Sequence, residues 1–135
     1  ALAKPYLKEY AQILDPFCGV GTLLMERRFA VPARNAYGID TFGEAIEKAR
    51  VNSKIAGMQT NYINRDYFDF VHDYKFDEIV TDLPAGNLSL PFIRSLMMHM
   101  VFTTNFQSSS FSSGVFRISA GFLSKPSGQC SLVHL

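Results

Sequence analysis

The stretch that decides the fold is Ile13-Leu14-Asp15-Pro16-Phe17-Cys18-Gly19-Val20-Gly21-Thr22. Its apolar start predicts a short buried strand, and its glycines predict a tight turn that opens a helix. Two glycines flanking one residue let backbone N–H groups come within hydrogen-bonding distance of a bound molecule, where side chains would obstruct them. Such turns are also common as plain corners, so the segments that follow must decide between a corner and a site.

Three further segments predict strands, and an aspartate follows each of them. The segments are residues 35–39, 62–63 and 76–81, and the polar residues after them are Asp40, Asp66 and Asp82. Helical patterns begin at Thr22 and cover residues 42–56 between these strands. We therefore predict an α/β fold: a Rossmann-like, doubly wound, mainly parallel sheet with helices on both faces. Because the carboxyl ends of parallel strands meet at one edge, the acids are expected at a common ligand-binding edge.

The last third of the chain shows weaker patterns. Residues 90–102 are apolar nearly all round and predict a buried helix, and residues 103–114 predict a Ser-rich loop. Residues 115–123 are compatible with strand or helix and are predicted here as helix, with a fifth strand over 130–135. The sheet is thus expected to be incomplete at its C-terminal end. We expect the 135 residues to form one domain of a longer protein, because the chain does not begin with Met.

Composition restricts the cellular setting more than the function. A formal net charge of +1 with 19% charged residues predicts neither nucleic-acid nor membrane binding by itself. The two cysteines, Cys18 and Cys130, stand far apart, which argues against a disulfide framework and for a reducing compartment. No apolar run is as long as a membrane span. We therefore expect a cytoplasmic protein that does not insert into membranes.

The segment Asp15-Pro16-Phe17-Cys18-Gly19-Val20-Gly21-Thr22 resembles the Asp-Pro-x-Cys-Gly-Ser-Gly-Thr signature of the RNA guanine-N2 methylases. These are class I S-adenosylmethionine-dependent methyltransferases often found beside a THUMP RNA-binding domain. The resemblance covers roughly residues 11–86. It implies S-adenosylmethionine as cofactor, a tRNA or rRNA substrate, and an RNA-binding domain outside this chain.

The resemblance also implies roles for individual residues. The glycine turn would hold the methionine part of the cofactor, with Asp15 near its ammonium group and backbone N–H groups near its carboxylate. The residues assigned to the cofactor in this turn are Asp15, Pro16, Cys18, Gly19, Gly21 and Thr22. Asp40 would accept the ribose hydroxyls and Asp66 the adenine amino group, and Ile39 and Tyr67 are candidates for the apolar slot around the ring. The 19 residues from Gly21 to Asp40 also match a nucleotide-binding βαβ unit.

Asp82-Leu83-Pro84 is the predicted catalytic segment. An amino group conjugated to a ring is a poor nucleophile because its lone pair is delocalised, so the protein must orient the nitrogen toward the sulfonium methyl group. The Asp82 carboxylate and the Leu83 carbonyl could accept its two hydrogens, and Pro84 restricts the backbone of Leu83. The segment corresponds to the family's Asn/Asp-Pro-Pro-aromatic motif. Leu83 replaces the first proline, and Ala85 replaces the aromatic residue that would stack on a flipped-out base.

Each assigned residue also has a purely structural interpretation. Asp15 and Asp66 could cap turns, Asp40 could simply end a strand, and Asp82 could belong to an Asx-Pro turn. Cys18 is interpreted as a small buried residue rather than a nucleophile. The three histidines show no metal-ligand spacing, so no metal site is predicted.

Three alternatives to methyl transfer onto guanine remain open. The chain could be an incomplete or non-catalytic cofactor-binding module, because Ala85 is not aromatic and no sequence remains for the last two strands of a complete methyltransferase sheet. The exposed sheet edge would then allow oligomerisation or covering by a partner. A nicotinamide oxidoreductase is opposed by Leu24, which stands where a third glycine is expected. Within methyltransferases, adenine N6 or a protein glutamine could be the acceptor.

Overall fold

The computed structural model describes residues 7, 9–82, 89–103, 115–118 and 131–132. Within these residues, six parallel strands form one sheet in the order β3-β2-β1-β4-β5-β6. The strands are β1 (Ala11–Asp15), β2 (Ala33–Asp40), β3 (Asn61–Asn64), β4 (Glu78–Thr81), β5 (Val115–Ile118) and β6 (Ser131–Leu132). The order reverses direction between β1 and β4, and this is the switch point where open parallel sheets bind ligands at the carboxyl ends of their strands.

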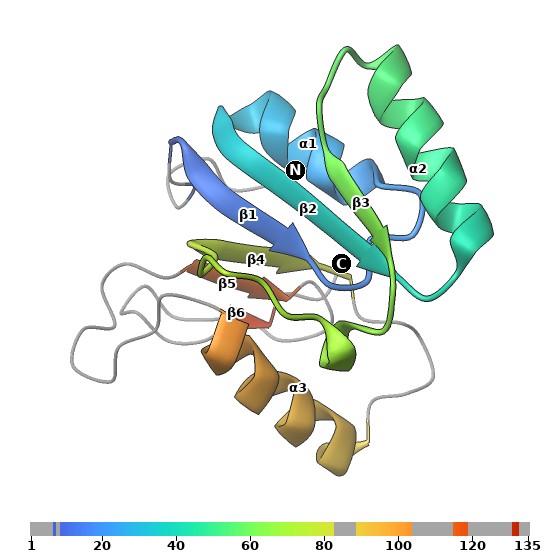
Figure 1. Cartoon of the computed structure of the whole chain (residues 1–135). Coiled ribbons are helices and arrows are strands. Elements are labelled where there is room, and N and C mark those ends of the chain that lie inside the picture. The colour runs from blue at the N-terminus through green and yellow to red at the C-terminus, as the bar shows by residue number, and fades with distance from the viewer. Residues whose placement is uncertain (1–6, 8, 83–88, 104–114, 119–130, 133–135) are drawn as a thin grey trace.

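Helices cover both faces of the sheet, as predicted (Figure 1). They are α1 (Thr22–Ala30) and α2 (Gly43–Ile55) on one face and α3 (Leu90–Thr103) on the other. A short 3₁₀ helix, η2 (Tyr67–Asp69), follows β3. The left-handed Gly21 (φ 85°) precedes α1, and Pro32 follows it. The left-handed Gly57 (φ 69°) follows α2.

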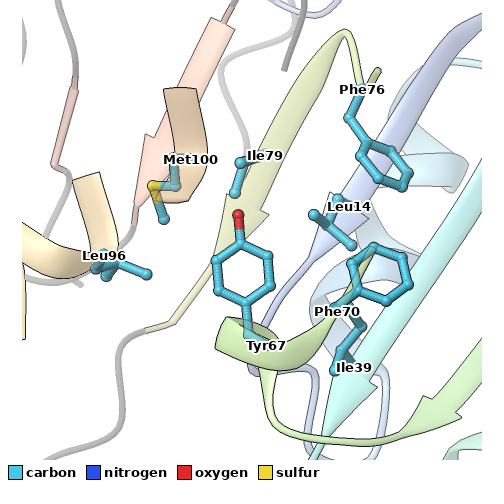
Figure 2. Close-up of a cluster of buried hydrophobic side chains, with 8 residues drawn as sticks. All are labelled: Leu14, Ile39, Tyr67, Phe70, Phe76, Ile79, Leu96 and Met100. Carbon is cyan, nitrogen blue, oxygen red and sulfur yellow. The ribbon is translucent and has the colours of Figure 1, made fainter. Parts of the chain in front are cut away.

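Two apolar clusters form the core, one on each face of the sheet. Successive β1 residues point to opposite faces, so Ile13 packs toward α1 and α2 while Leu14 packs toward α3. Figure 2 shows the cluster on the α3 face, with Tyr67 surrounded by apolar side chains and its hydroxyl directed away from the η2 backbone. Its buried members are Leu14, Ile39, Tyr67, Phe70, Phe76, Ile79, Leu96 and Met100.

A buried ion pair joins α1 to β4. The Arg27 guanidinium donates to both carboxylate oxygens of Glu78, from Nε to Oε1 at 2.7 Å and from Nη2 to Oε2 at 3.0 Å. Arg27 also donates to the carbonyl of Val31 at the end of its helix. Both charged side chains are almost completely buried, so the pairing offsets the cost of removing them from water.

One predicted element is wrong. Residues 115–123 were expected to be helical, but Val115–Ile118 forms strand β5, paired in parallel with β4. Val, Phe and Ile favour strands, and the side of β4 that faces away from β1 carries backbone groups that a neighbouring strand can pair with and a helix cannot. The predicted strand over 130–135 is present as β6 (Ser131–Leu132). The Ser-rich residues 104–114 lie outside the described residues.

Among the described helices, none combines the length and apolar character needed to cross a bilayer.

Candidate functional site

The glycine turn after β1 is held against the end of β2. The Cys18 N–H donates to the Ile39 carbonyl at 2.9 Å, and the Gly21 N–H donates to the Cys18 carbonyl at 2.8 Å. Cys18 itself is buried, with a free thiol. Burial raises the pKa of this thiol, and the negative charges of Asp15 and Asp40 raise it further, so Cys18 stays protonated. The interpretation of Cys18 as a buried structural residue rather than a nucleophile therefore agrees with the geometry.

The two glycines of the turn have different surroundings. Both have positive φ, 52° at Gly19 and 85° at Gly21. A Cβ atom added to Gly21 would lie 2.4 Å from the Tyr62 hydroxyl oxygen, whereas one added to Gly19 would meet no atom of the described residues within 4 Å. Gly21 is therefore required for packing, and Gly19 faces open space where a ligand could lie.

The N-terminus of α1 lies directly behind this turn. Gly21 at its N-cap position provides no side-chain hydrogen bond, and the first helical turn contains no acidic residue. The first N–H groups of a helix have no partner within the helix and carry partial positive charge. This end of α1 is therefore suited to a carboxylate or another anion.

Asp40 connects the turn to the start of α2. Its Oδ2 accepts a hydrogen bond from the Gly19 N–H at 2.8 Å, and its Oδ1 accepts one from the Phe42 N–H at 2.9 Å. Each carboxylate oxygen can accept a second hydrogen bond, so Asp40 remains able to bind a hydroxyl. Asn64 at the end of β3 donates to the backbone carbonyls of Asp40 and Thr41, both at 2.9 Å, which holds this edge in place.

Asp15 lies beneath the turn and is only 1% exposed. Its Oδ1 accepts hydrogen bonds from the Thr81 hydroxyl at 2.6 Å and from the Phe17 N–H at 3.0 Å. Burial raises the pKa of Asp15 to about 7 against the lowering effect of these two donors, and the nearby charges of Asp82 and Asp40 raise it as well. The negative charges of Asp82 and Asp40 thus act on the buried Asp15 carboxyl from the same edge of the sheet.

Asp82 follows β4 directly and its side chain is exposed, unlike that of Asp15. The predicted partners Leu83 and Pro84, like Ala85, lie outside the described residues. Of the other residues assigned to the cofactor, Pro16 is buried beside Asp15, and Thr22 is exposed at the first position of α1.

Asp66 lies after β3, at the same edge as the other acids. Its Oδ1 accepts a hydrogen bond from the Phe68 N–H at 2.9 Å, which caps η2. The capping role is the structural interpretation that the sequence offered. Because the side chain is exposed, it also remains accessible to a ligand.

The two residues predicted to line an apolar slot for the adenine ring are buried in the core. Ile39 is 0% exposed and Tyr67 is 1% exposed, so both belong to the core, where the Tyr67 hydroxyl pairs with the Thr103 hydroxyl at 2.6 Å. Their side chains therefore do not present a surface to a ligand. The accessible rings beside the acids are Phe42, 74% exposed, and Phe68, 36% exposed. Each stands two residues after its acid, and this shared spacing was the signal in the sequence that could have identified them.

A cavity of about 140 Å³ lies between α3 and the segment before β4. Phe70, His72, Lys75, Phe76, His99 and Thr103 are among its lining residues, and none of these was assigned to the site. In the described part of the chain, no group of three or more His, Cys, Asp or Glu side chains is placed to hold a metal ion.

Comparison with known proteins gives a consistent picture. A family described as RMKL-like, methyltransferase domain, matches residues 6–89. The chain is 33% identical over 91 residues to an uncharacterized RNA methyltransferase from Enterococcus faecalis, which covers 63% of this chain and 20% of that protein. It spans about a fifth of the length of the curated relatives that it matches.

Solved structures share the fold at low sequence identity. A putative rRNA-methylase from Clostridium thermocellum has a TM-score of 0.66 at 14% identity, over 93% of this chain and 70% of that one. An S-adenosylmethionine-dependent methyltransferase from Clostridium acetobutylicum has a TM-score of 0.58 at 20% identity, over 69% and 38% of the respective chains. These likenesses show the Rossmann-like fold that the sequence predicted.

Proposed function

We propose that this chain, which belongs to the family of RMKL-like methyltransferase domains, transfers the methyl group of S-adenosylmethionine to an exocyclic amino nitrogen of a base in RNA. Guanine N2 in tRNA or rRNA is the favoured acceptor. One observation carries the proposal: Asp15 and Asp40 both accept hydrogen bonds from the backbone of the glycine turn, and Asp15 is also bonded to Thr81, the residue before Asp82. This turn lies at the edge of the parallel sheet formed by the carboxyl ends of its strands, where such sheets bind ligands.

The residues at this edge suit the parts of S-adenosylmethionine. The N-terminus of α1 would hold the methionine carboxylate. Asp15 is 1% exposed, so it would attract the ammonium group from beneath the turn, through the charge of its ionised form, and not by direct contact. Asp40 would accept the ribose hydroxyls, and Asp66 the adenine amino group, with the exposed rings of Phe42 and Phe68 beside them. When bound, the cofactor supplies an electrophilic methyl group that needs no covalent help from the protein.

Asp82 would orient the acceptor nitrogen. Its exposed carboxylate at the end of β4 can accept a hydrogen from an amino group and turn the nitrogen lone pair toward the methyl group. Charge-assisted hydrogen bonds of this kind also stabilise the positive charge that develops on the nitrogen.

RNA as the acceptor is supported by the Asp-Pro-Phe-Cys-Gly signature and by the relative described as an RNA methyltransferase. The formal charge of +1 gives this chain little attraction for RNA of its own, so we propose that an RNA-binding domain outside it supplies affinity. The reaction is proposed to take place in the cytoplasm, where the free Cys18 thiol stays reduced.

A transfer assay with methyl-labelled S-adenosylmethionine tests the proposal. The chain, alone and within its full-length parent, is incubated separately with total RNA, DNA and protein. We expect label in RNA, recovered as N2-methylguanine after digestion to nucleosides. Label in N6-methyladenine would reassign the base, and label in protein would overturn the RNA proposal.

Calorimetry distinguishes catalysis from cofactor binding alone. Asp82→Ala is expected to abolish transfer while leaving S-adenosylmethionine affinity within about threefold of the wild type, because Asp82 contacts the acceptor. Cofactor binding by the wild type without transfer to RNA, DNA or protein would instead identify a non-catalytic binding module. Loss of both transfer and binding in Asp82→Ala would assign that residue a structural role.

A further inference from the structure

Aromatic rings from three separate elements gather beside the glycine turn. The Phe92 ring of α3 lies 6.3 Å from the Phe17 ring of the turn and 6.0 Å from the Phe68 ring of η2, measured between ring centroids. The planes of Phe92 and Phe68 are inclined by 78°, an edge-to-face arrangement that aromatic pairs favour. We call Phe17, Phe68 and Phe92 the edge rings.

The edge rings pack against the apolar core, but each remains partly exposed to solvent. Phe17 lies 6.1 Å from the ring of Tyr67, which is 1% exposed, and both Phe17 and Phe92 pack against the core cluster as partly buried residues. Phe68 is 36% exposed. Single exposed apolar residues are ordinary, but adjacent rings held together at a ligand-binding edge form an apolar surface that a ligand can cover.

Hydrogen bonds to Asp15 place the glycine turn beside the end of β4, which the proposed catalytic residue Asp82 follows. The Phe17 N–H donates to Asp15, and Asp15 also accepts a hydrogen bond from Thr81, the residue that precedes Asp82. The Asp82 charge acts on the Asp15 carboxyl. Phe17 in the glycine turn and Thr81 at the end of β4 thus donate to the same oxygen of Asp15, so the turn and the strand end that leads to Asp82 are adjacent. An acceptor held at Asp82 would therefore lie next to the glycine turn, whose Phe17 ring packs beside Phe92.

A base taken out of an RNA stack loses its stacking partners, and enzymes that act on such bases supply aromatic side chains in their place. In this sequence the fourth-strand segment Asp82-Leu83-Pro84-Ala85 contains no aromatic residue. Phe92 comes after that segment in the sequence and lies near the start of α3, where its ring packs beside the Phe17 ring of the glycine turn.

We propose that the acceptor base stacks on Phe92, with Phe17 and Phe68 supporting that ring. The inference rests on the proposed function and narrows it, because a ring surface beside Asp82 selects an unpaired or flipped planar nucleobase over a protein glutamine side chain. Phe92 thereby supplies the contact that Ala85 lacks.

Substitutions that separate ring stacking from packing test this role. Phe92→Leu keeps an apolar side chain but removes the ring, Phe92→Tyr keeps the ring, and Met98→Ala removes a 60% exposed side chain from the same helix as a control. Methyl transfer to total RNA is measured for each variant in the full-length parent. S-adenosylmethionine affinity and the thermal midpoint are measured on the same preparations.

We expect Phe92→Leu to lower kcat/KM for RNA about tenfold or more, with cofactor affinity unchanged and the thermal midpoint close to that of the wild type. Phe92→Tyr and Met98→Ala should stay within about threefold of the wild type. A wild-type rate in Phe92→Leu overturns the inference, as does a parallel loss of transfer, cofactor affinity and thermal stability. A wild type that binds cofactor but does not methylate RNA overturns the proposed function, and this inference with it.

Discussion

The Oδ2 atom of Asp40, at the end of β2, accepts a 2.8 Å hydrogen bond from the backbone N–H of Gly19, in the turn after β1. The two residues are 21 positions apart in the sequence, and this bond sets the position of the turn relative to the carboxylate proposed to bind ribose. The Asp40 carboxylate thus holds the turn in place at Gly19, the glycine that has open space beside it.

Replacing Asp40 should therefore weaken cofactor binding in two ways. Asp40→Ala removes the acceptor for the ribose hydroxyls and releases the Gly19 N–H, and hydrogen bonds to charged groups contribute roughly 1.5–3 kcal/mol each. We expect S-adenosylmethionine affinity, measured by calorimetry, to fall by roughly 10-fold to 100-fold. Asp73→Ala, at an exposed acid in the segment before β4, is the control and should bind normally. Unchanged affinity in Asp40→Ala would contradict the site.

The two glycines of the turn should respond differently to alanine. A Cβ at Gly21 would collide with the Tyr62 hydroxyl at 2.4 Å, so Gly21→Ala should lower the free energy of unfolding by more than 2 kcal/mol, from overpacking and positive-φ strain together. Gly19→Ala meets only strain, about 1 kcal/mol. Its Cβ enters the open space, however, so its cofactor affinity should fall while the fold is largely kept. Urea unfolding and calorimetry measure the two effects, and equal destabilisation of both variants would refute the distinction.

Asp15 should make stability depend on pH. Its pKa is raised from 3.8 to about 7 in the folded chain, so the folded state binds more protons than the unfolded state between these values. Stability from this group is full below about pH 4 and is lost as the pH rises through 7, a difference of up to about 4 kcal/mol. Asp15→Asn has no such ionisation, and it should gain stability relative to the wild type from pH 4 to pH 8. Denaturant titrations across this range, in which the difference stayed constant, would disprove the assignment.

The buried ion pair between Arg27 and Glu78 should be costly to break from one side. Arg27→Met leaves the Glu78 carboxylate buried without its guanidinium, which should cost roughly 3–5 kcal/mol of unfolding free energy. The double variant Arg27→Met with Glu78→Leu removes both charges and should recover much of that loss. Guanidinium chloride unfolding in a double-mutant cycle measures the coupling. The exposed pair of Lys48 and Glu44 serves as the comparison and should contribute less than 1 kcal/mol.

The fold and the outline of the site followed from local sequence patterns. Alternating apolar and helical segments are short-range signals, so β1 to β4, α1 to α3 and the acids at the strand ends could be placed without coordinates. The glycine turn was equally predictable, because glycine is the residue that readily adopts the positive φ found at Gly19 and Gly21. Parallel pairing then required Asp15, Asp40, Asp66 and Asp82 to meet at one edge.

Tertiary structure alone decided which side chains this edge presents. Tyr67 and Ile39 look like accessible neighbours of the acids in sequence, yet α3 and β4 cover them, and Phe42 and Phe68 are left exposed. The strand Val115–Ile118 depends in the same way on an unpaired side of β4, more than 30 residues earlier in the chain. Local patterns determined where each strand ends, because backbone preferences act over a few residues. Burial, partner strands and the raised pKa of Asp15 depend on groups that are distant in sequence, so only the folded chain could establish them.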